Sequence, residues 1–512
     1  MTLTELQVFA ALFATAGLLG FGQQASRKHW LLALPLLAFI LSMIAVVSVR
    51  SVMLPVAFVA LPVFVIFCAR YGLWKQQPPK RRPVSAAALA IATLAVMLPP
   101  AMFTADVEFP DLEGPHPVGV RAAEVSDPER GNGWDGVSDG PRRFLLRVWY
   151  PAATIPEGAE NHRNTVYERR NARVLGQQGI DPFQLFSEAL AKTETNAFWD
   201  APVAEGQFPL LIYSHGYGGN VSVNAMLMEQ LASHGFIVVS LSHPGESHDL
   251  VYLDGEVMPR SPRANAVRNE GIAVLDIWDQ DIDARMAWVR DELSQMLFIK
   301  ERMPLWALDF QSVVEALEDQ YLSDSATEIV GAMDFGAIGF LGMSGGAASA
   351  PAACHVNTRC DAAVALDVLG GLNSMRDTPI RTPLLVFESQ FPHGVMGQYL
   401  FYERHSEYGL NPDIHRIVFP LNGHSDFTDR AFALTGFGKW LLNYLPPVLL
   451  GPVDAQETTL TQSRLVTGFF EIYLKGAEPA GFPGAILDET DIAEPIDPAP
   501  FRDWVHRQRV SQ

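Results

Sequence analysis

A serine between glycines is the residue of this sequence best placed to act as a nucleophile. The segment Gly342-Met343-Ser344-Gly345-Gly346 follows an apolar run typical of a buried strand and precedes a run of small residues typical of a helix. A turn this tight needs small neighbours and exposes the serine hydroxyl, and the helix start favours developing negative charge. We therefore predict that Ser344 is the nucleophile of an elbow formed with Gly342, Met343 and Gly346. A purely structural glycine-rich turn is the alternative.

A serine nucleophile needs a base and a third group that holds the base, and after such an elbow the chain order is serine, acid, histidine. Asp367 directly follows the apolar run Ala362–Leu366, and His424 follows the run that ends at Pro420. The carboxyl ends of parallel strands open onto the crevice where ligands bind. These positions predict a Ser344–Asp367–His424 catalytic triad.

Other acids and histidines fit these roles less well. Asp361 begins its apolar run and would lie at the wrong edge of a sheet. His405 lies in a segment with a helical pattern, and His393 follows the preceding strand instead of the last one. An isolated histidine in a loop is usually only solvated, so the assignment of His424 as the base depends on the presence of Ser344 and Asp367.

The segment Tyr213–Asn220 places a His-Gly step after an early apolar run, where the second oxyanion donor of such enzymes normally lies. We predict an oxyanion hole formed by the backbone N–H groups of Tyr217 and Gly345, with His215 bracing the loop. The segment Ser242–Asp249 is rich in possible ligands, but nothing elsewhere completes a metal coordination sphere. We interpret it as a loop lining the cleft and expect neither a metal nor a cofactor.

These side chains must be positioned by a sheet, and the sequence from about residue 115 predicts one. Its apolar runs are continuous, which is typical of strands covered on both faces, and they alternate with helical stretches. This pattern predicts an α/β-hydrolase fold, a mostly parallel sheet flanked by helices, over residues 105–476. The predicted strands are Arg143–Pro151, Phe208–Ser214, Gly235–Ser242, Ala337–Gly342, Ala362–Leu366, Pro383–Glu388 and His415–Pro420, and the predicted helices are Asn224–His234, Gln280–Leu293 and Ala347–Cys354.

Two stretches interrupt this alternation, residues 153–206 and 298–325. We interpret both as insertions that could cover an active site; ordinary surface excursions are the alternative, above all for the second. Residues 477–512 are rich in Pro, Asp and Glu, which predicts an irregular acidic tail.

Residues 1–104 have a different composition and predict about four transmembrane helices. A helix that crosses a bilayer needs about 20 mostly apolar residues, and a succession of such runs does not fit a signal peptide. None of the runs contains Asp, Glu, Lys or Arg, so we expect them to anchor the protein; a substrate or partner site within the bilayer is the alternative. The four runs are Leu6–Phe21, Trp30–Val49, Val52–Ala69 and Val84–Phe103.

The loops between these runs predict their orientation. Arg27 and Lys28 follow the first run, and five basic residues lie between Arg70 and Arg82, after the third. Because clustered Lys and Arg mark the cytoplasmic side, we expect a multi-pass protein of the cell membrane with its catalytic domain on the extracytoplasmic side.

Beyond residue 104 the chain is strongly acidic, with 29 basic and 56 acidic side chains and a net charge of −27. Such a surface repels phosphate backbones, which argues against nucleic-acid binding. Cys354 and Cys360 could form a short-loop disulfide in an exported domain or remain free thiols, and no Cys-x-x-Cys pair suggests a metal or redox site.

Several segments together resemble one enzyme family, that of platelet-activating factor acetylhydrolase of the lipoprotein-associated phospholipase A2 type. The similar segments, within Arg143–Gly476, are LRVWYPA, PLLIYSHGYGG, GFLGMSGGA, ALDVLGG, NGHSDFTD and FFEIYLKG. The acid placed directly after the strand next to the nucleophile helix is the more specific part of this resemblance. Met343 and Gly345 depart from the family pattern, which usually has His before the serine and a bulky residue after it.

The resemblance implies the α/β-hydrolase fold, the triad and oxyanion donors given above, and hydrolysis of short or oxidised acyl chains from glycerophospholipids without calcium. The residues alone predict an ester hydrolase acting through an acyl-enzyme. They leave open an acyltransferase with the same triad, an esterase for non-lipid or polymeric esters, and a membrane receptor with a vestigial hydrolase domain.

Overall fold

The computed structural model describes residues 108–134, 140–155, 193–264, 295–319, 327–368, 380–389, 411–433 and 450–497, with a few isolated positions elsewhere. The chain divides into two compact units, and the sheet and the candidate site belong to the unit made of Glu108–Glu168, Thr193–Phe432 and Lys439–Gln512. The four predicted transmembrane helices lie outside the described residues. Within the described part, no helix combines the length and the apolar character needed to cross a bilayer.

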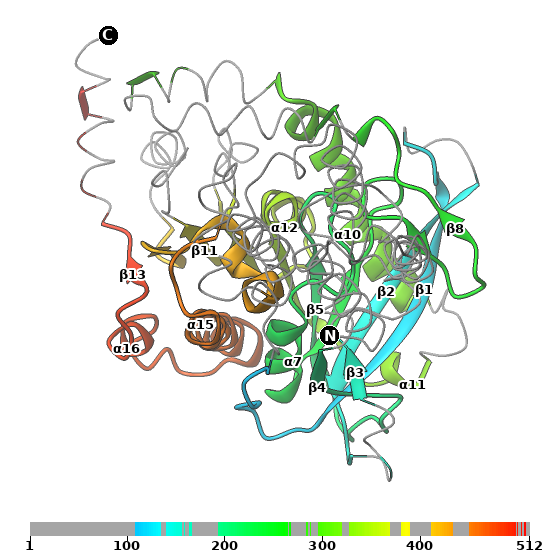
Figure 1. Ribbon diagram of the computed structural model, residues 1–512, viewed down its shortest axis with the longest axis horizontal. Coiled ribbons are helices and arrows are strands. Elements are labelled where there is room, and N and C mark those ends of the chain that lie inside the picture. The colour runs from blue at the N-terminus through cyan, green and yellow to red at the C-terminus, as the bar shows by residue number, and fades with distance from the viewer. Residues whose placement is uncertain are drawn as a thin grey trace, which may run out of the picture. The chain divides into compact units, whose positions relative to one another are not determined.

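A mixed sheet is the frame of this unit (Figure 1). Its six central strands are parallel to one another, from β12 to β6, and β2 is antiparallel to both of its neighbours. Among the described residues the strand order is β13 (Glu494–Pro495), β12 (Ile414–Phe419), β11 (Leu384–Ser389), β10 (Ala362–Leu366), β9 (Met333–Met343), β5 (Phe208–Ser214), β6 (Ile237–Leu241), β2 (Pro141–Pro151), β1 (Val118–Gly131), β4 (Glu194–Trp199) and β3 (Arg163–Thr165). A separate small hairpin is formed by β7 (Leu250–Val251) and β8 (Val257–Met258).

Helices cover both faces of the sheet, which explains why its central strands are apolar along their whole length. On β5, Leu210 and Ile212 pack into the same core as α10 (Met303–Glu318) and α12 (Gly345–Val356). The alternate residue Leu211 faces the opposite core, with α7 (Ala225–Ser233) and α15 (Ala455–Lys475). Figure 1 shows these two helical layers on either side of the strands. Shorter elements are η7 (Phe298–Arg302), α11 (Thr327–Val330), η10 (His424–Phe427), η11 (Asp429–Ala433) and α16 (Gly484–Leu487).

Each of the seven predicted strands is present with bounds close to those expected, and the helices predicted at 224–234 and 347–354 are α7 and α12. The helix predicted at 280–293 lies outside the continuously described residues. Strand β1 was not predicted, because only part of its length is buried and polar residues interrupt its apolar pattern. It pairs with β2 along almost its entire length.

The prediction that residues 153–206 form an insertion is corrected at the C-terminal end of this stretch, which the structure describes. Residues 194–199 form β4, which runs parallel to β1 with Ala197 opposite Val118, so this segment belongs to the main sheet. Its apolar residues are few and separated by polar ones, which hid the strand. The rest of 153–206 lies largely outside the described residues.

The second predicted insertion is corrected as well. Most of residues 298–325 form η7 and α10, and Trp306, Phe310 and Val313 of α10 are completely buried against the sheet. The segment is therefore a core helix of the fold, and only its beginning approaches the candidate site.

The C-terminal segment is more ordered than predicted. It contains α16, and β13 adds an edge strand antiparallel to β12, with Pro495 opposite Ile417. Cys354 and Cys360, whose state the sequence left open, form a disulfide at the end of α12.

Candidate active site

Ser344 occupies a sharp turn between β9 and α12. Its backbone angles, φ 56° and ψ −112°, lie outside the regions that non-glycine residues normally adopt, as in the elbows that present a nucleophile. A Cβ on Gly342 would overlap the backbone of Gly346, and a Cβ on Gly346 would overlap the carbonyl oxygen of Ser214. The two glycines are therefore required by the close approach of β5, β9 and α12.

Residues that follow two other strands, β10 and β12, also lie at this turn. The Nε2 of His424 lies 2.9 Å from Ser344 Oγ, and its Nδ1 lies 2.5 Å from Asp367 Oδ2. Asp367 follows β10 with a φ of 57°, and His424 begins η10 after β12. The carboxylate accepts a hydrogen bond from Nδ1–H, which leaves the unprotonated Nε2 facing the serine hydroxyl. The structure thus brings together the three residues predicted as a triad.

Ser389 also belongs to this group, although the sequence analysis did not select it. Its backbone N–H donates to Asp367 Oδ1 at 2.7 Å, and its hydroxyl donates to Asp367 Oδ2 at 2.9 Å. The residue ends β11, whose Phe387 lies opposite Leu366 of β10. A signal was available in the sequence: Ser389 is a polar residue at the end of the predicted strand that follows Asp367.

Asp426 fixes the loop that carries His424 and was likewise missed. Its Oδ2 accepts the backbone N–H groups of Gly423 at 2.8 Å and of Gly451 at 2.5 Å, and the side chain is fully buried. These bonds close the histidine loop on itself and tie it to the segment that precedes α15.

The predicted oxyanion donors lie close together. A Cβ on Gly216 would lie 3.1 Å from Ser344 Cβ, and a Cβ on Gly345 would lie 3.3 Å from the backbone nitrogen of Tyr217. The backbone of the 215–219 loop therefore passes directly beside Ser344 and the first residue of α12. This is where two N–H groups can serve one oxygen atom.

His215 is completely buried beneath that loop. Its Nδ1 donates to the carbonyl oxygen of Gly216 at 2.8 Å, and its Nε2 lies 2.8 Å from Ser247 Oγ. Burial lowers the pKa of His215 well below its usual value, so the ring is neutral. These contacts hold the loop from below.

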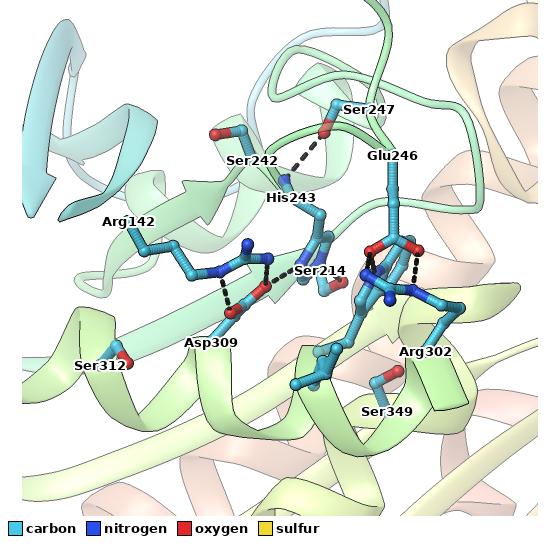
Figure 2. A network of polar contacts seen from close by, with 12 residues as sticks. Arg142, Ser214, Ser242, His243, Glu246, Ser247, Arg302, Asp309, Ser312 and Ser349 are labelled. Atoms are coloured by element: carbon cyan, nitrogen blue, oxygen red, sulfur yellow. Dashed lines mark hydrogen bonds and ion pairs between the residues drawn. The ribbon is translucent and has the colours of Figure 1, made fainter. Parts of the chain in front are cut away.

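A second serine–histidine–aspartate array lies under the site (Figure 2). Ser214 Oγ lies 2.8 Å from His243 Nε2, and His243 Nδ1 lies 2.8 Å from Asp309 Oδ2. All three side chains have no exposed surface, so no substrate can reach them. Figure 2 shows Asp309 between His243 and Arg142, whose Nε and Nη2 donate to it at 2.7 and 2.8 Å.

The charges within this array are fixed by its neighbours. Burial alone would raise the pKa of Asp309, but the charges of Arg142 and Arg130 and the hydrogen bond from His243 lower it far below its usual value. Burial lowers the pKa of His243, and its bond to Asp309 offsets this only in part. A neutral histidine thus lies between an ionised aspartate and a serine, and the array stabilises the end of β5 from which the 215–219 loop starts.

The loop Ser242–Asp249 is anchored by η7 and α10. Glu246 accepts two hydrogen bonds from Arg302, at 3.0 and 2.7 Å, and one from Trp306 Nε1 at 3.0 Å. The Trp306 ring stacks on His243 with centroids 3.6 Å apart and lies parallel to Tyr217 at 5.8 Å. Much of this loop is therefore buried, which corrects its interpretation as a lining of the cleft.

The rival candidates take no part in the site where the structure describes them. Asp361 accepts the backbone N–H of Ile338 at 3.0 Å, away from the carboxyl ends of the strands. His393 and His405 lie outside the described residues. The described residues contain no cluster of His, Cys, Asp and Glu that could hold a metal ion.

The sheet order and the elbow are those of an α/β hydrolase. Comparison with protein families makes this more specific: residues 101–473 match the family described as platelet-activating factor acetylhydrolase, isoform II, and the chain belongs to this family.

Curated relatives carry the same name at low identity. The chain is 25% identical over 306 residues to platelet-activating factor acetylhydrolase of Canis lupus familiaris, covering 56% of this chain and 63% of the relative. It is 24% identical over 284 residues to the protein of Cavia porcellus, covering 54% of this chain and 60% of the relative. It is 24% identical over 348 residues to the protein of Bos taurus, covering 64% of this chain and 72% of the relative. The similarity thus spans less than two thirds of the length of the first two relatives.

Among solved structures, a ferulic acid esterase from Streptomyces cinnamoneus is similar to this chain, with a TM-score of 0.53 and 22% identity. The match covers 77% of this chain and all of the esterase chain. At this identity the likeness supports the shared fold alone.

Proposed function

We propose that this protein is a serine hydrolase of carboxylic esters. Ser344 Oγ attacks the ester carbonyl while His424 Nε2 takes its proton. His424 then passes that proton to the leaving alcohol, which departs and leaves an acyl-serine. Water attacks this intermediate with His424 again as base, releasing the carboxylic acid and restoring the serine, while Asp367 stabilises the imidazolium formed in each half-reaction.

One observation carries this proposal. The imidazole of His424 lies within hydrogen-bond distance of Ser344 on one side, 2.9 Å, and of Asp367 on the other, 2.5 Å. A general base must reach the proton that it removes, and a third group must fix its orientation. Both conditions are met by side chains from three different strand ends.

The backbone N–H groups of Tyr217 and Gly345 are the proposed oxyanion donors. They lie beside the nucleophile, where the carbonyl oxygen gains negative charge as the serine attacks. A donor of this kind typically contributes about 3 kcal/mol of transition-state stabilisation.

The proposed substrates are esters with short or oxidised acyl chains, of the glycerophospholipid type. Membership of the platelet-activating factor acetylhydrolase family supports this choice, as do the names of the curated relatives. Phospholipid esters combine a reactive carbonyl with a charged headgroup, and an enzyme held at a membrane would meet them directly.

The test is hydrolysis of esters of graded acyl length, from acetyl to palmitoyl, by the full chain. Wild type should prefer the short chains and react with a fluorophosphonate, and Ser344→Ala should lose both properties. Ser126→Ala provides the control, because this residue lies on β1, four strands from β9 in the sheet. Ester hydrolysis that persists in Ser344→Ala would contradict the proposal.

We also propose that residues 1–104 anchor the protein in the cell membrane with the hydrolase unit on the extracytoplasmic side. The uncharged apolar runs and the basic loop between Arg70 and Arg82 support this orientation. Reporter fusions at residue 110 test it, and reporter activity in the cytoplasm would refute it.

A further inference from the structure

The guanidinium group of Arg260 lies against the loop that carries the proposed oxyanion donor. A Cβ on Gly218 would lie 3.3 Å from Arg260 Nη2 and 3.4 Å from its Cζ. The same guanidinium lies over the ring of Tyr217, with Cζ 5.6 Å from the ring centroid. Gly218 has a φ of +72° and no side chain, which is what allows the cation to approach this closely.

No acidic group of the described residues offsets this charge. Only the backbone N–H of Arg260 contacts a carboxylate, that of Asp249 at 2.7 Å, and its Nε is buried without a hydrogen-bond partner. The nearby carboxylate of Glu246 is bound by Arg302 and Trp306.

Three buried arginines of the described unit differ in this respect. They form ion pairs with carboxylates, as Arg142 does with Asp309, Arg302 with Glu246 and Arg416 with Glu388. The phenol of Tyr217 supplies no counter-charge either, because burial raises its pKa despite the opposing effect of Arg260. Arg260 is thus a half-buried cation for which the described part of this strongly acidic protein supplies no counter-ion.

This cation lies one tight turn away from the nucleophile. The backbone N–H of Gly219 donates to the carbonyl oxygen of Gly216 at 2.8 Å, so residues 216–219 form a turn whose ends are close together. Gly216 faces Ser344 Cβ, whereas Gly218 faces Arg260. The serine and the guanidinium therefore lie against the same short turn.

We infer that Arg260 forms a subsite for an anionic group of the ester substrate, a phosphate or a carboxylate, next to the oxyanion loop. The inference rests on the proposed function and specifies its substrate class. A guanidinium offers paired N–H donors that match the oxygens of phosphate and carboxylate, and its charge raises the local concentration of anionic substrate. The subsite selects esters that carry a negative charge at a fixed distance from the scissile carbonyl.

Three related substrates test this subsite. The first is a neutral ester, 1-alkyl-2-acetylglycerol. The second is the same molecule with a phosphate-containing headgroup, and the third is a glycerol ester whose acyl chain ends in a carboxylate. The kcat/KM ratio of each anionic ester to the neutral one isolates the contribution of the charge, because general damage to the loop affects all three substrates alike.

Arg260→Gln should lower one of these ratios about tenfold, mainly through KM, because it removes a charge-assisted hydrogen bond to the substrate. The ratio that falls identifies the anion as phosphate or carboxylate. Arg260→Lys should retain part of the preference, because it keeps the charge without the paired donors. Added salt should lower the same ratio in wild type more than in Arg260→Gln. Arg263→Gln is the matched control, an exposed arginine three positions away.

Failure of this inference and failure of the proposed function give different results. If wild type hydrolyses the neutral ester, Ser344→Ala does not, and neither ratio changes in Arg260→Gln or Arg260→Lys, Arg260 only packs on the loop and the inference is wrong. If the neutral ester is not hydrolysed, or is hydrolysed equally by Ser344→Ala, the proposed function itself is wrong.

Discussion

Ser389 donates two hydrogen bonds to the carboxylate of Asp367, from its backbone nitrogen at 2.7 Å and from its hydroxyl at 2.9 Å. Together with His424 Nδ1, these donors occupy both carboxylate oxygens. The carboxylate is thereby held in one orientation, and the orientation of His424 follows from it. In the proposed mechanism Ser389 is a positioning residue, because it would act on the reaction through Asp367.

Asp367→Asn should lower kcat about 10⁴-fold, because an amide in this place favours the wrong histidine tautomer. Ser389→Ala should lower kcat roughly tenfold, because residue 389 would then hold Asp367 through its backbone N–H alone. Steady-state kinetics on an acetyl ester measures both effects. KM should change little in either variant, and a loss confined to KM would contradict a positioning role for Ser389.

The glycines of the elbow should differ in their tolerance of a methyl group. A Cβ on Gly346 overlaps the backbone of Ser214, which cannot move away without disturbing β5. A Cβ on Gly345 meets the ring of Phe298 at 3.0 Å, and a side chain can shift. Gly346→Ala should therefore cost about 1–3 kcal/mol of unfolding free energy and most activity, whereas Gly345→Ala should cost less stability. Urea unfolding of both variants gives the comparison, and equal losses would be inconsistent with this packing.

The buried array beneath the site should contribute strongly to stability. Arg142→Met would remove the two hydrogen bonds that this arginine donates to the buried carboxylate of Asp309, and removal of one partner of a buried ion pair typically costs about 3–5 kcal/mol. Arg359→Gln is the control, because its ion pair with Glu318 is largely exposed and such pairs contribute about 0–1 kcal/mol. Denaturant unfolding near neutral pH measures both. If the two variants lost the same unfolding free energy, the buried array would contribute no more to stability than an exposed ion pair.

Glu229 predicts a specific pH dependence of stability. The side chain is fully buried on α7, and burial raises the pKa of its carboxyl to about 8, against 4.5 for an unperturbed glutamate. Between these values the native state keeps a proton that the unfolded chain releases. The contribution of this residue to stability is therefore complete below pH 4.5 and decreases as the pH rises to about 8.

The unfolding free energies of wild type and Glu229→Gln should diverge over this pH range. That of wild type should fall more steeply with rising pH, since a neutral glutamine has no proton to lose. Glu205→Gln, at an exposed site, should follow wild type. Parallel curves for wild type and Glu229→Gln would show that the carboxyl titrates normally.

Local patterns in the sequence were sufficient to predict many of the strands and helices of the fold. Strands β5 and β10 were predicted with their observed ends, because a strand buried on both faces is a continuous apolar run bounded by polar or small residues. Half-buried β1 and β4 lack such a run and were missed or assigned to an insertion. Helix α10 was misassigned for a related reason, since the preceding segment gives no clear strand that would mark it as part of the core.

What the sequence alone determined was the choice of Ser344, Asp367 and His424, because each follows an apolar strand and the carboxyl ends of parallel strands share one edge of the sheet. Only the tertiary structure decided which other residues meet them there. Ser389 and Arg260 are unremarkable in the sequence, since their roles depend on partners far away along the chain. Strand order and loop packing bring such residues together, and hydrophobic patterning does not encode side-chain distances of a few ångströms.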